Sequence, residues 1–325
     1  MTGRKNLRIF LILITIFLFV SYLALFAGYK DFGFQLFKDY LSKDNSVILM
    51  DILRIPRYTK CLIAGSCLAL SGMLLQSVSK NPLAEPYITG ISSGAGFGIV
   101  LSVLCFGGIS YSLFGFLGAL ITAVIVILLC GFGRFSITKL VLIGLSVNMF
   151  AGSVISFLIL KNPEKSYSLM YILTGNITEN AGVSDNVLLL IFALAIIVSA
   201  LFVPKLNLLR LDGELIRNKN RRKENYDIQI VILSSFFAAL SVLTAGILSF
   251  TGIIAPQIAK IIIGNDYRYL FFANILIGAI FTLFADFLSR VLLYPVQIPL
   301  GLVVAFIGSP VFVYFLLKKG VISND

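Results

Sequence analysis

The chain has 325 residues, of which 58% are hydrophobic and only 13% are charged, and its mean hydropathy is +0.99. This composition excludes a water-soluble domain and indicates a protein whose surroundings are lipid. The 26 Lys and Arg residues outnumber 15 Asp and Glu residues, and there is no histidine, so catalytic and zinc sites built on imidazole are excluded. A Gly-Lys-Ser/Thr phosphate loop is also absent from the sequence.

Apolar runs bounded by charge, proline or glycine follow one another along the chain. A helix needs roughly 20 mostly apolar residues to cross a bilayer. The runs lie near residues 7–28, 58–78, 87–106, 111–130, 140–160, 187–203, 228–248, 251–264, 269–288 and 298–317. The first run is too long for the apolar region of a cleaved signal peptide, so we count it as a span. The sequence therefore predicts an all-α polytopic membrane protein of about ten transmembrane helices, in one domain over residues 1–325.

The distribution of Lys and Arg predicts the orientation of the chain. If the N-terminus lies in the cytoplasm, most positive residues fall on the cytoplasmic side, including those of the basic segment 204–227. This asymmetry follows the positive-inside rule, and an even number of spans puts both termini in the cytoplasm. Two sets of five spans also favour inverted repeats, in which the second set enters the membrane from the opposite face.

The cysteines give no sign of a metal site. All four lie inside apolar runs, so we interpret them as small buried side chains; they are Cys61, Cys67, Cys105 and Cys130. No metal ligand set and no disulfide framework is predicted from them.

The most specific string of the sequence lies within residues 64–96. Asn81 and Pro82 are expected to end one helix and form a tight inner turn, because proline lacks the donor that a continuing helix needs. Gly90 and Gly94 begin a series of glycines at every fourth residue, which leaves a smooth helix face for close backbone approach. Taken alone, the glycines are more typical of ordinary membrane helix packing than of a specific functional site.

The sequence resembles the FecCD-type permeases, the membrane subunits of iron-siderophore, haem and cobalamin ABC importers. The resemblance spans nearly the whole chain and rests on five ordered motifs: Arg54-Ile55-Pro56-Arg57, the string from Asn81 to Gly96, Ser249-Phe250-Thr251-Gly252-Ile253-Ile254-Ala255-Pro256, Ala285-Asp286 with Arg290, and Pro299-Leu300-Gly301 through Gly308-Ser309-Pro310. It implies ten helices per subunit in the bacterial cytoplasmic membrane and two permease subunits, identical or homologous, around one pathway. It also implies two cytoplasmic ATPases that bind ATP and Mg²⁺, an extracytoplasmic binding protein, and neither a bound cofactor nor a nucleic-acid partner for this chain.

Three arginines are candidates for docking the binding protein. Arg54 and Arg57 precede the second span and Arg290 ends the ninth, so all three are expected on the outer side. The resemblance implies that they meet acidic residues of the binding protein, a task that suits the permanently charged, bidentate guanidinium. The alternative is that they only extend into the membrane interface without a partner.

The basic inner segment 204–227 is the candidate for contact with the ATPase. The resemblance implies a short coupling helix that binds in a groove of the ATPase and transmits a rigid-body movement. Its candidate residues are Leu209, Leu211, Asp212, Gly213, Glu214, Leu215 and Arg217. The strongly basic stretch 218–223 departs from the family pattern, and the alternative is a cationic loop that fixes topology and touches anionic lipid.

The junction of the fourth and fifth spans is a candidate cytoplasmic gate. The resemblance implies that Ser136, Ile137 and Thr138 narrow the exit of the pathway, where Ile137 replaces an expected hydroxyl residue. An apolar constriction can close by dewetting. Helix capping by Ser136 or Thr138 explains the same residues equally well.

Three further positions depart from the family pattern. Gln257 and Lys260 stand where the family usually has histidine and arginine, and they are expected to share one helix face. Gln297 replaces an acidic residue before the Leu-Pro-Val-Gly type motif of the family. Because the histidine is absent, no pH-sensitive role is expected at that position.

The sequence as a whole predicts a transport subunit and not an enzyme. We expect a permease that moves an iron-siderophore, haem or cobalamin-type chelate inward by alternating access, with the fifth and tenth spans lining the pathway as the resemblance implies. The alternative is a stand-alone secondary transporter of a small organic or metal-chelate solute, which needs intramembrane acids or bases. The spans are interpreted as uncharged apart from Lys260 and Asp286 near span ends, which disfavours that alternative.

Overall fold

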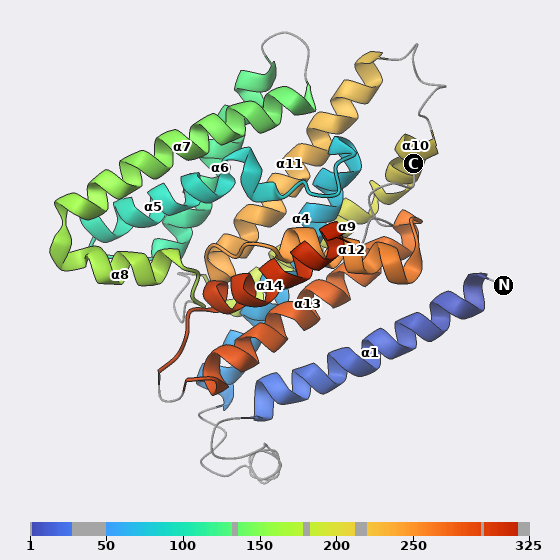
Figure 1. Ribbon diagram of the computed structural model, residues 1–325, viewed down its shortest axis with the longest axis horizontal. Coiled ribbons are helices and arrows are strands. Elements are labelled where there is room, and N and C mark those ends of the chain that lie inside the picture. Colours follow the sequence, from blue (N-terminus) through green and yellow to red (C-terminus); the bar gives the residue numbers. More distant parts are fainter. Residues whose placement is uncertain are drawn as a thin grey trace.

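The computed structural model describes residues 2–27, 50–131, 136–177, 183–211, 220–293 and 296–317, and every regular element in these ranges is a helix (Figure 1). The elements are α1 (Thr2–Phe26), η1 (Met50–Arg54), α4 (Ile55–Ser79), η2 (Pro86–Thr89), α5 (Ile91–Cys105), α6 (Tyr111–Gly131), α7 (Ile137–Lys161), α8 (Pro163–Leu173), α9 (Asp185–Ala200), α10 (Val203–Leu211), α11 (Asn220–Ala245), α12 (Thr251–Ile263), α13 (Tyr267–Val291) and α14 (Leu300–Leu317). Six helical segments are long and apolar enough to cross a membrane, and four shorter apolar helices accompany them. The predicted all-α polytopic fold is confirmed.

The helices fall on the predicted apolar runs, and two short helices are additional. α8 lies in the predicted outer segment that follows the fifth span, and it begins at Pro163, whose missing N–H costs nothing in the first turn. α10 lies in the basic inner segment directly after α9. Neither helix is long enough to cross a bilayer.

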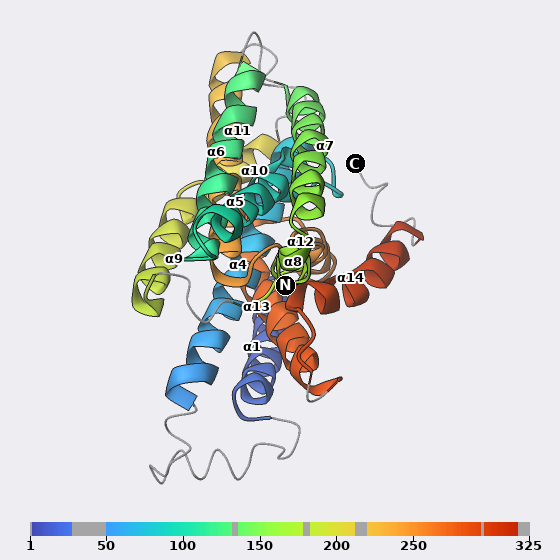
Figure 2. The same ribbon diagram turned by 90° about the vertical axis from the view of Figure 1, so that its left-hand side faces the viewer.

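α4 is the central helix of the bundle. From Lys60 to Gln76 every residue except Leu62 is buried, and the helix runs between α11 and α13 (Figures 1 and 2). Close backbone approach explains this position, because a Cβ on Gly65 would collide with the Gly278 carbonyl of α13. In lipid, such tight van der Waals contact is a main source of helix association.

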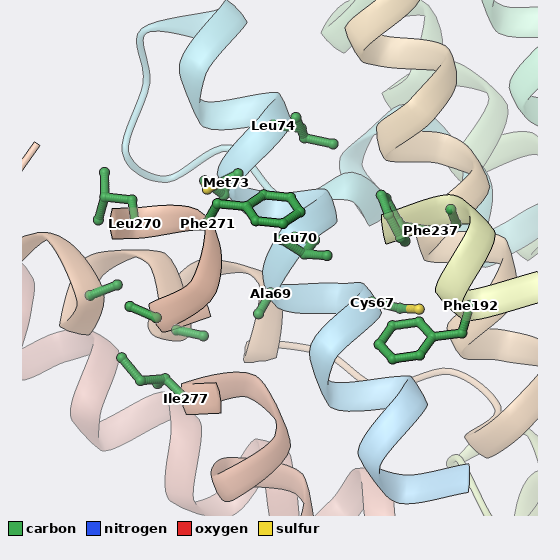
Figure 3. Close-up of a cluster of buried hydrophobic side chains, with 14 of the residues drawn as sticks. Cys67, Ala69, Leu70, Met73, Leu74, Phe192, Phe237, Leu270, Phe271 and Ile277 are labelled. Atoms are coloured by element: carbon green, nitrogen blue, oxygen red, sulfur yellow. The ribbon is translucent and has the colours of Figure 1, made fainter. Parts of the chain in front are cut away.

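Large side chains fill the space around α4. Figure 3 shows Phe271 of α13 lying against Leu70 and Met73 of α4, and Phe192 of α9 lying beside Cys67. Phe271 and Leu70 are almost completely buried. The core therefore lies along α4, where it is reached by helices from both halves of the chain.

The two sets of five long or apolar helices pack in corresponding ways. The first set is α1, α4, α5, α6 and α7, and the second is α9, α11, α12, α13 and α14. The second helix of each set packs against the fourth helix of the other set, as α4 does on α13 and α11 on α6. α4 and α11 also pack against each other, and the third helix packs on the fourth in both sets, as α5 on α6 and α12 on α13. This correspondence is the pattern expected of two structural repeats.

The turn after α4 folds back into the bundle. Lys80, with φ of 51°, is the C-cap residue of α4, and Asn81 Oδ1 then accepts a hydrogen bond from the Leu83 N–H, 2.9 Å away. The segment continues into η2, and Gly90, with φ of 88°, is the N-cap residue of α5. The predicted turn at Asn81 and Pro82 is confirmed, and its continuation packs Pro86 against Gly252 of α12.

The glycines of α5 serve close helix packing, so the simpler interpretation of their spacing is correct. A Cβ on Gly94 would collide with Thr122 of α6, and a Cβ on Gly98 would collide with the Phe114 carbonyl. Because α5 and α6 approach this closely, each substitution must displace backbone or a buried side chain.

Pro256 lies inside α12, and the polar group that it frees has a partner. Proline cannot donate to the carbonyl four residues earlier, which belongs to Gly252. Gln76 Nε2 of α4 donates to that carbonyl at 3.4 Å instead. A neighbouring helix thus satisfies the backbone that the proline leaves open, as lipid surroundings require.

The Pro299 and Gly301 motif positions the start of α14. The Gly301 N–H donates to the Gly175 carbonyl at 3.1 Å, and a Cβ on Gly301 would collide with the Thr174 carbonyl. Pro299 supplies the carbonyl that accepts from the Leu302 N–H at 3.1 Å. This motif therefore joins α14 to the segment that follows α8.

One cysteine differs from its prediction. Cys61, Cys67 and Cys130 are buried as expected, whereas Cys105, at the end of α5, is exposed. All four are free thiols, and the described residues contain no group of His, Cys, Asp or Glu that could hold a metal.

Candidate functional site: a cationic cavity at the predicted outer end

A buried carboxylate connects α4 and α13 at the predicted outer end of the bundle. Arg57 Nε lies 2.8 Å from Asp286 Oδ1, and Arg290 Nε lies 3.1 Å from Asp286 Oδ2. Only 3% of the Asp286 side chain is exposed. Charge-assisted hydrogen bonds to both oxygens compensate the desolvation of this carboxylate.

Local helix structure places these groups. Arg57 lies in the first turn of α4, next to Pro56, and Asp286 and Arg290 are four residues apart on one face near the end of α13. The two helices are held together below the cluster by the Thr282 hydroxyl, which donates to the Cys61 carbonyl at 3.0 Å. Their close packing brings the start of one helix to the end of the other.

The guanidinium groups also bind neighbouring main-chain and amide oxygens. Arg290 Nη2 donates to the Ala24 carbonyl at 2.7 Å, and Arg54 Nη1 donates to the Leu25 carbonyl at 2.5 Å. Both carbonyls belong to the last turn of α1, where a helix lacks internal donors and favours positive charge. Arg57 Nη1 donates to Gln297 Oε1 at 3.1 Å.

The three arginines that are predicted to dock a binding protein therefore lie close together in space. Arg54 and Arg290 are 236 positions apart in the sequence. They are not free projections from the surface, because 20% of the Arg57 side chain and 15% of the Arg290 side chain is exposed. Their contacts to Asp286 and α1 hold the guanidiniums in place. Their role toward a partner stays a prediction.

A cavity of about 220 Å³ lies among these groups. It is lined by Ala24, Ile52, Leu53, Arg54, Pro56, Arg57, Tyr58, Lys60, Ile177, Asp286, Arg290 and Gln297. Four of the lining side chains are cations and one is a carboxylate, so the cavity carries an excess of positive charge. Anionic groups are the ligands that such surroundings favour.

Sequence reasoning missed Lys60, which is a charged residue inside the second span. Its side chain is 3% exposed, and its Nζ lies 3.7 Å from Asp185 Oδ1 of α9. The spans are therefore not uncharged apart from Lys260 and Asp286. The spacing of Arg54, Arg57 and Lys60, at i, i+3 and i+6, is the sequence signal that could have found it.

Gln257 and Lys260 share a face of α12, as predicted, and they converge on α4. Gln257 Nε2 donates to Gln76 Oε1 at 3.0 Å and lies 2.9 Å from the Pro82 carbonyl, while Lys260 Nζ lies 3.2 Å from the same Gln76 oxygen. This polar network ties α12 to α4 and to the turn after α4, at the predicted inner end.

The gate candidates lie at the start of α7. Ser136 occupies the N-cap position, and its carbonyl accepts from the Leu140 N–H at 3.0 Å, but its side chain makes no capping hydrogen bond. Side-chain capping by Ser136 is therefore wrong. Ile137 is half-buried and Thr138 is exposed. The constriction itself stays a prediction.

The coupling candidates are only partly described. Leu209 and Leu211 belong to α10, whereas Asp212, Gly213, Glu214, Leu215 and Arg217 lie outside the described residues.

Asn207 fixes α10 to the start of α13. Its Nδ2 donates to Asp266 Oδ1 at 2.9 Å, and its Oδ1 accepts from the Tyr267 N–H at 3.0 Å. Asp266 also caps α13 through the Arg268 N–H at 3.0 Å. α10 is thus joined to a long membrane helix by two hydrogen bonds of one side chain.

The ten apolar helices, the packing of the two halves and the cationic end together define a polytopic membrane permease. The chain belongs to the FecCD transport family, whose model matches residues 11–318. It is 31% identical over 324 residues to the Fe(3+)-citrate import system permease protein YfmD of Bacillus subtilis (strain 168), covering 97% of this chain and 96% of that protein. It is 33% identical over 327 residues to the probable heme-iron transport system permease protein IsdF of Staphylococcus aureus (strain Newman), covering 98% of each chain.

The fold is also similar to a solved structure. That structure is described as an inward-facing conformation of a transporter of the metal-chelate ABC type, and the TM-score is 0.80 at 25% sequence identity. The likeness covers 98% of this chain and 100% of the other. The resemblance inferred from the ordered motifs is thereby confirmed for the whole described chain.

Proposed function

We propose that this chain is the membrane-spanning permease subunit of a binding-protein-dependent ABC importer for iron chelates. The observation that carries the proposal is the near full-length similarity to permeases of iron-citrate and haem import systems, together with the similarity to a metal-chelate ABC transporter. Iron-siderophore and haem-type chelates are the substrate class that these relatives favour. The chain supplies a pathway by alternating access and no chemistry.

The cationic cavity is proposed as the docking site of the extracytoplasmic binding protein. Arg54, Arg57 and Arg290 lie around one cavity, and the bonds of Arg57 and Arg290 to Asp286 preorganise their guanidiniums. Preorganised guanidiniums lose little side-chain entropy when they bind a carboxylate. This arrangement supports electrostatic docking of an acidic partner surface.

α10 is proposed as the part of the permease that receives the motion of a cytoplasmic ATPase. Its attachment to α13 through Asn207 supports this role, because a push on α10 then reaches a helix that packs along α4. ATP and Mg²⁺ are bound on the ATPase subunits, of which two serve one transporter. This chain binds no cofactor of its own in the proposed cycle.

A second permease subunit is proposed to pack against α7 and α14. Among the residues of α7 only Leu140 and Gly144 are buried, and α14 leaves apolar side chains such as Phe306 exposed. Two such faces related by symmetry can enclose a pathway between the subunits. Ser136, Ile137 and Thr138 at the start of α7 then lie at its predicted cytoplasmic exit.

The proposed setting is the bacterial cytoplasmic membrane, with both termini in the cytoplasm. The positive-inside distribution of Lys and Arg supports this orientation. Cysteine labelling from either side of intact cells tests it: residue 205, changed to cysteine, is expected to react only from the cytoplasmic side.

Reconstitution tests the function. Proteoliposomes that hold the permease with its ATPase are supplied with the binding protein and with ferric citrate, a ferric siderophore or haem. Uptake is expected only when ATP and the binding protein are both present. Uptake by the permease alone, without a nucleotide-hydrolysing subunit, would show a secondary transporter and contradict the proposal.

A further inference from the structure

Lys205 of α10 lies between two aromatic rings. Its Nζ is 4.8 Å from the centroid of the Phe202 ring and 4.8 Å from the centroid of the Tyr226 ring. Both separations fall inside the roughly 6 Å over which an ammonium is attracted to the face of an aromatic ring. Lys205 and Tyr226 are half-buried, and this attraction grows stronger as water is excluded from it.

The two rings come from different elements. Phe202 immediately precedes α10, and its carbonyl accepts from the Leu206 N–H at 3.0 Å, so Phe202 and Lys205 belong to one helical turn and share a face of it. Tyr226 lies in the second turn of α11. The ammonium of Lys205 therefore joins α10 to the start of α11.

Another attachment of α10 lies two residues further on. Asn207 bonds Asp266 and the Tyr267 N–H at the start of α13. Residues two positions apart in a helix do not face the same side, so Lys205 and Asn207 reach two different neighbours. Between them, Leu206 is buried in the hydrophobic core to which α11 and α13 both contribute. α10 is thus attached to two long membrane helices.

These two helices are the ones between which α4 runs. A movement of α10 that was passed on through Asn207 alone would displace α13 relative to α11. With Lys205 as a second attachment, α10, α11 and α13 can move as one rigid body, which is a common way for packed helices to transmit a displacement. Such a movement reaches the central helix from both sides.

We propose that Lys205 is the positioning residue through which α10 holds α11, so that movement received from the ATPase enters α11 and α13 together. This inference rests on the proposed role of α10 and extends that role to a second membrane helix. The ammonium is the essential group, because the attraction acts between a positive charge and the negative face of the ring. An apolar side chain of similar length lacks it.

The test measures chelate uptake and ATP hydrolysis by the complete transporter in proteoliposomes supplied with the binding protein. The cargo is whichever of ferric citrate, a ferric siderophore and haem the wild type takes up best. K205M and Y226L are each expected to lower the chelate moved per ATP about threefold, the size of effect that a partly exposed cation–π contact supports. The double variant K205M/Y226L should lose no more than either single variant, because both changes remove the same contact.

Conservative variants and a charge control accompany these measurements. K205R keeps the cation and Y226F keeps the ring, so both should transport close to the wild-type ratio. K161M, at the exposed C-terminal end of α7, controls for the loss of one positive charge and should be unaffected. A loss in K205R as large as that in K205M would contradict a role for the cation.

Cross-linking separates the transmission of movement from a merely structural contact. K205C/Y226C, in a background whose four native cysteines are replaced by alanine, lacks the cation and should be as weakly coupled as K205M. A short bifunctional thiol reagent that joins the two cysteines is expected to restore coupling, because it ties α10 to α11 again. A monofunctional reagent should not. Loss of the remaining uptake on cross-linking, or no recovery, would overturn the proposal.

Failure of this inference is distinguishable from failure of the proposed role of α10. Normal coupling in K205M with reduced coupling in N207A removes only the role of Lys205, whereas normal coupling in both removes α10 from the path. If K205M no longer co-purifies with the ATPase, Lys205 contacts the ATPase itself and the proposal fails. A melting temperature in detergent identifies variants that have lost their fold; if K205M is one, K205Q is measured in its place against the same expectations.

Discussion

Arg290 Nη2 and the Ala24 carbonyl are 2.7 Å apart, so a residue near the end of the ninth span caps the last turn of the first. α1 has few buried residues and lies at the edge of the bundle beside α13 (Figure 1). The C-terminal end of α1 is therefore held by the same guanidiniums that surround the cationic cavity. The cavity that we propose for docking and the position of α1 are therefore physically connected.

Asp286 is expected to be the main stabilising group of this end. D286N leaves Arg57 and Arg290 close together without their shared carboxylate, and breaking a buried ion pair from one side costs about 3–5 kcal/mol. We expect a clearly lower melting temperature of the purified permease and a lower membrane level. D51N, which removes an exposed carboxylate from η1, should leave both unchanged. Wild-type melting of D286N would contradict the assignment of this role.

Gly72 is expected to tolerate no side chain. A Cβ at this position would collide with the main-chain carbonyl of Gly252 in α12, so α4 and α12 would have to separate. G72A should therefore reduce the amount of purified permease that elutes as a single peak in size-exclusion chromatography. G131A is the matched control, because nothing lies within 4 Å of a Cβ there. Equal yields of the two variants would show that this contact is not limiting.

Glu85 is expected to stabilise the start of α12 from the turn after α4. Its Oε1 accepts from the Phe250 N–H at 2.8 Å, and Phe250 has a φ of 67°, which is unfavourable for a residue with a side chain. E85A leaves that partly buried N–H without its acceptor and should cost about 1 kcal/mol or more. E85Q keeps an oxygen acceptor and should melt closer to the wild type. Equal losses in E85A and E85Q would mean that the charge, and not the hydrogen bond, matters.

Asn207 is expected to transmit motion between α10 and α13. N207A removes both hydrogen bonds to Asp266 and Tyr267 at once. We expect normal membrane levels but reduced ATP-driven uptake, with ATP hydrolysis less coupled to transport. N162A serves as the control. It removes a side-chain hydrogen bond to the Leu158 carbonyl at the C-terminal end of α7, and this variant should transport normally. Full uptake by N207A would exclude this attachment from the coupling path.

Several features of the fold were readable from the sequence because they depend on local order along the chain. Apolar runs of sufficient length predicted the helices, since a bilayer demands about 20 apolar residues for each crossing. Asn81 and Pro82 predicted the end of α4, because the limits that proline sets act within a few residues. The ordered motifs predicted the family, which the full-length comparisons confirm.

Other features depend on which helices meet, and the sequence alone left them open. Asn81 marked a turn but not its return into the bundle against Gly252, and the arginines were expected as surface groups before their bonds to Asp286 and α1 were seen. Lys60 was not singled out from the sequence at all.

The sequence by itself determined the class of protein, the places where the chain crosses the membrane and the family, because hydropathy and motif order are properties of consecutive residues. Only the tertiary structure decided that Lys60, Asp286 and the arginines share one cavity. Side chains more than 200 positions apart meet there because α1, α4 and α13 pack at one end, and the net charge of a cavity is set by the groups that surround it in space.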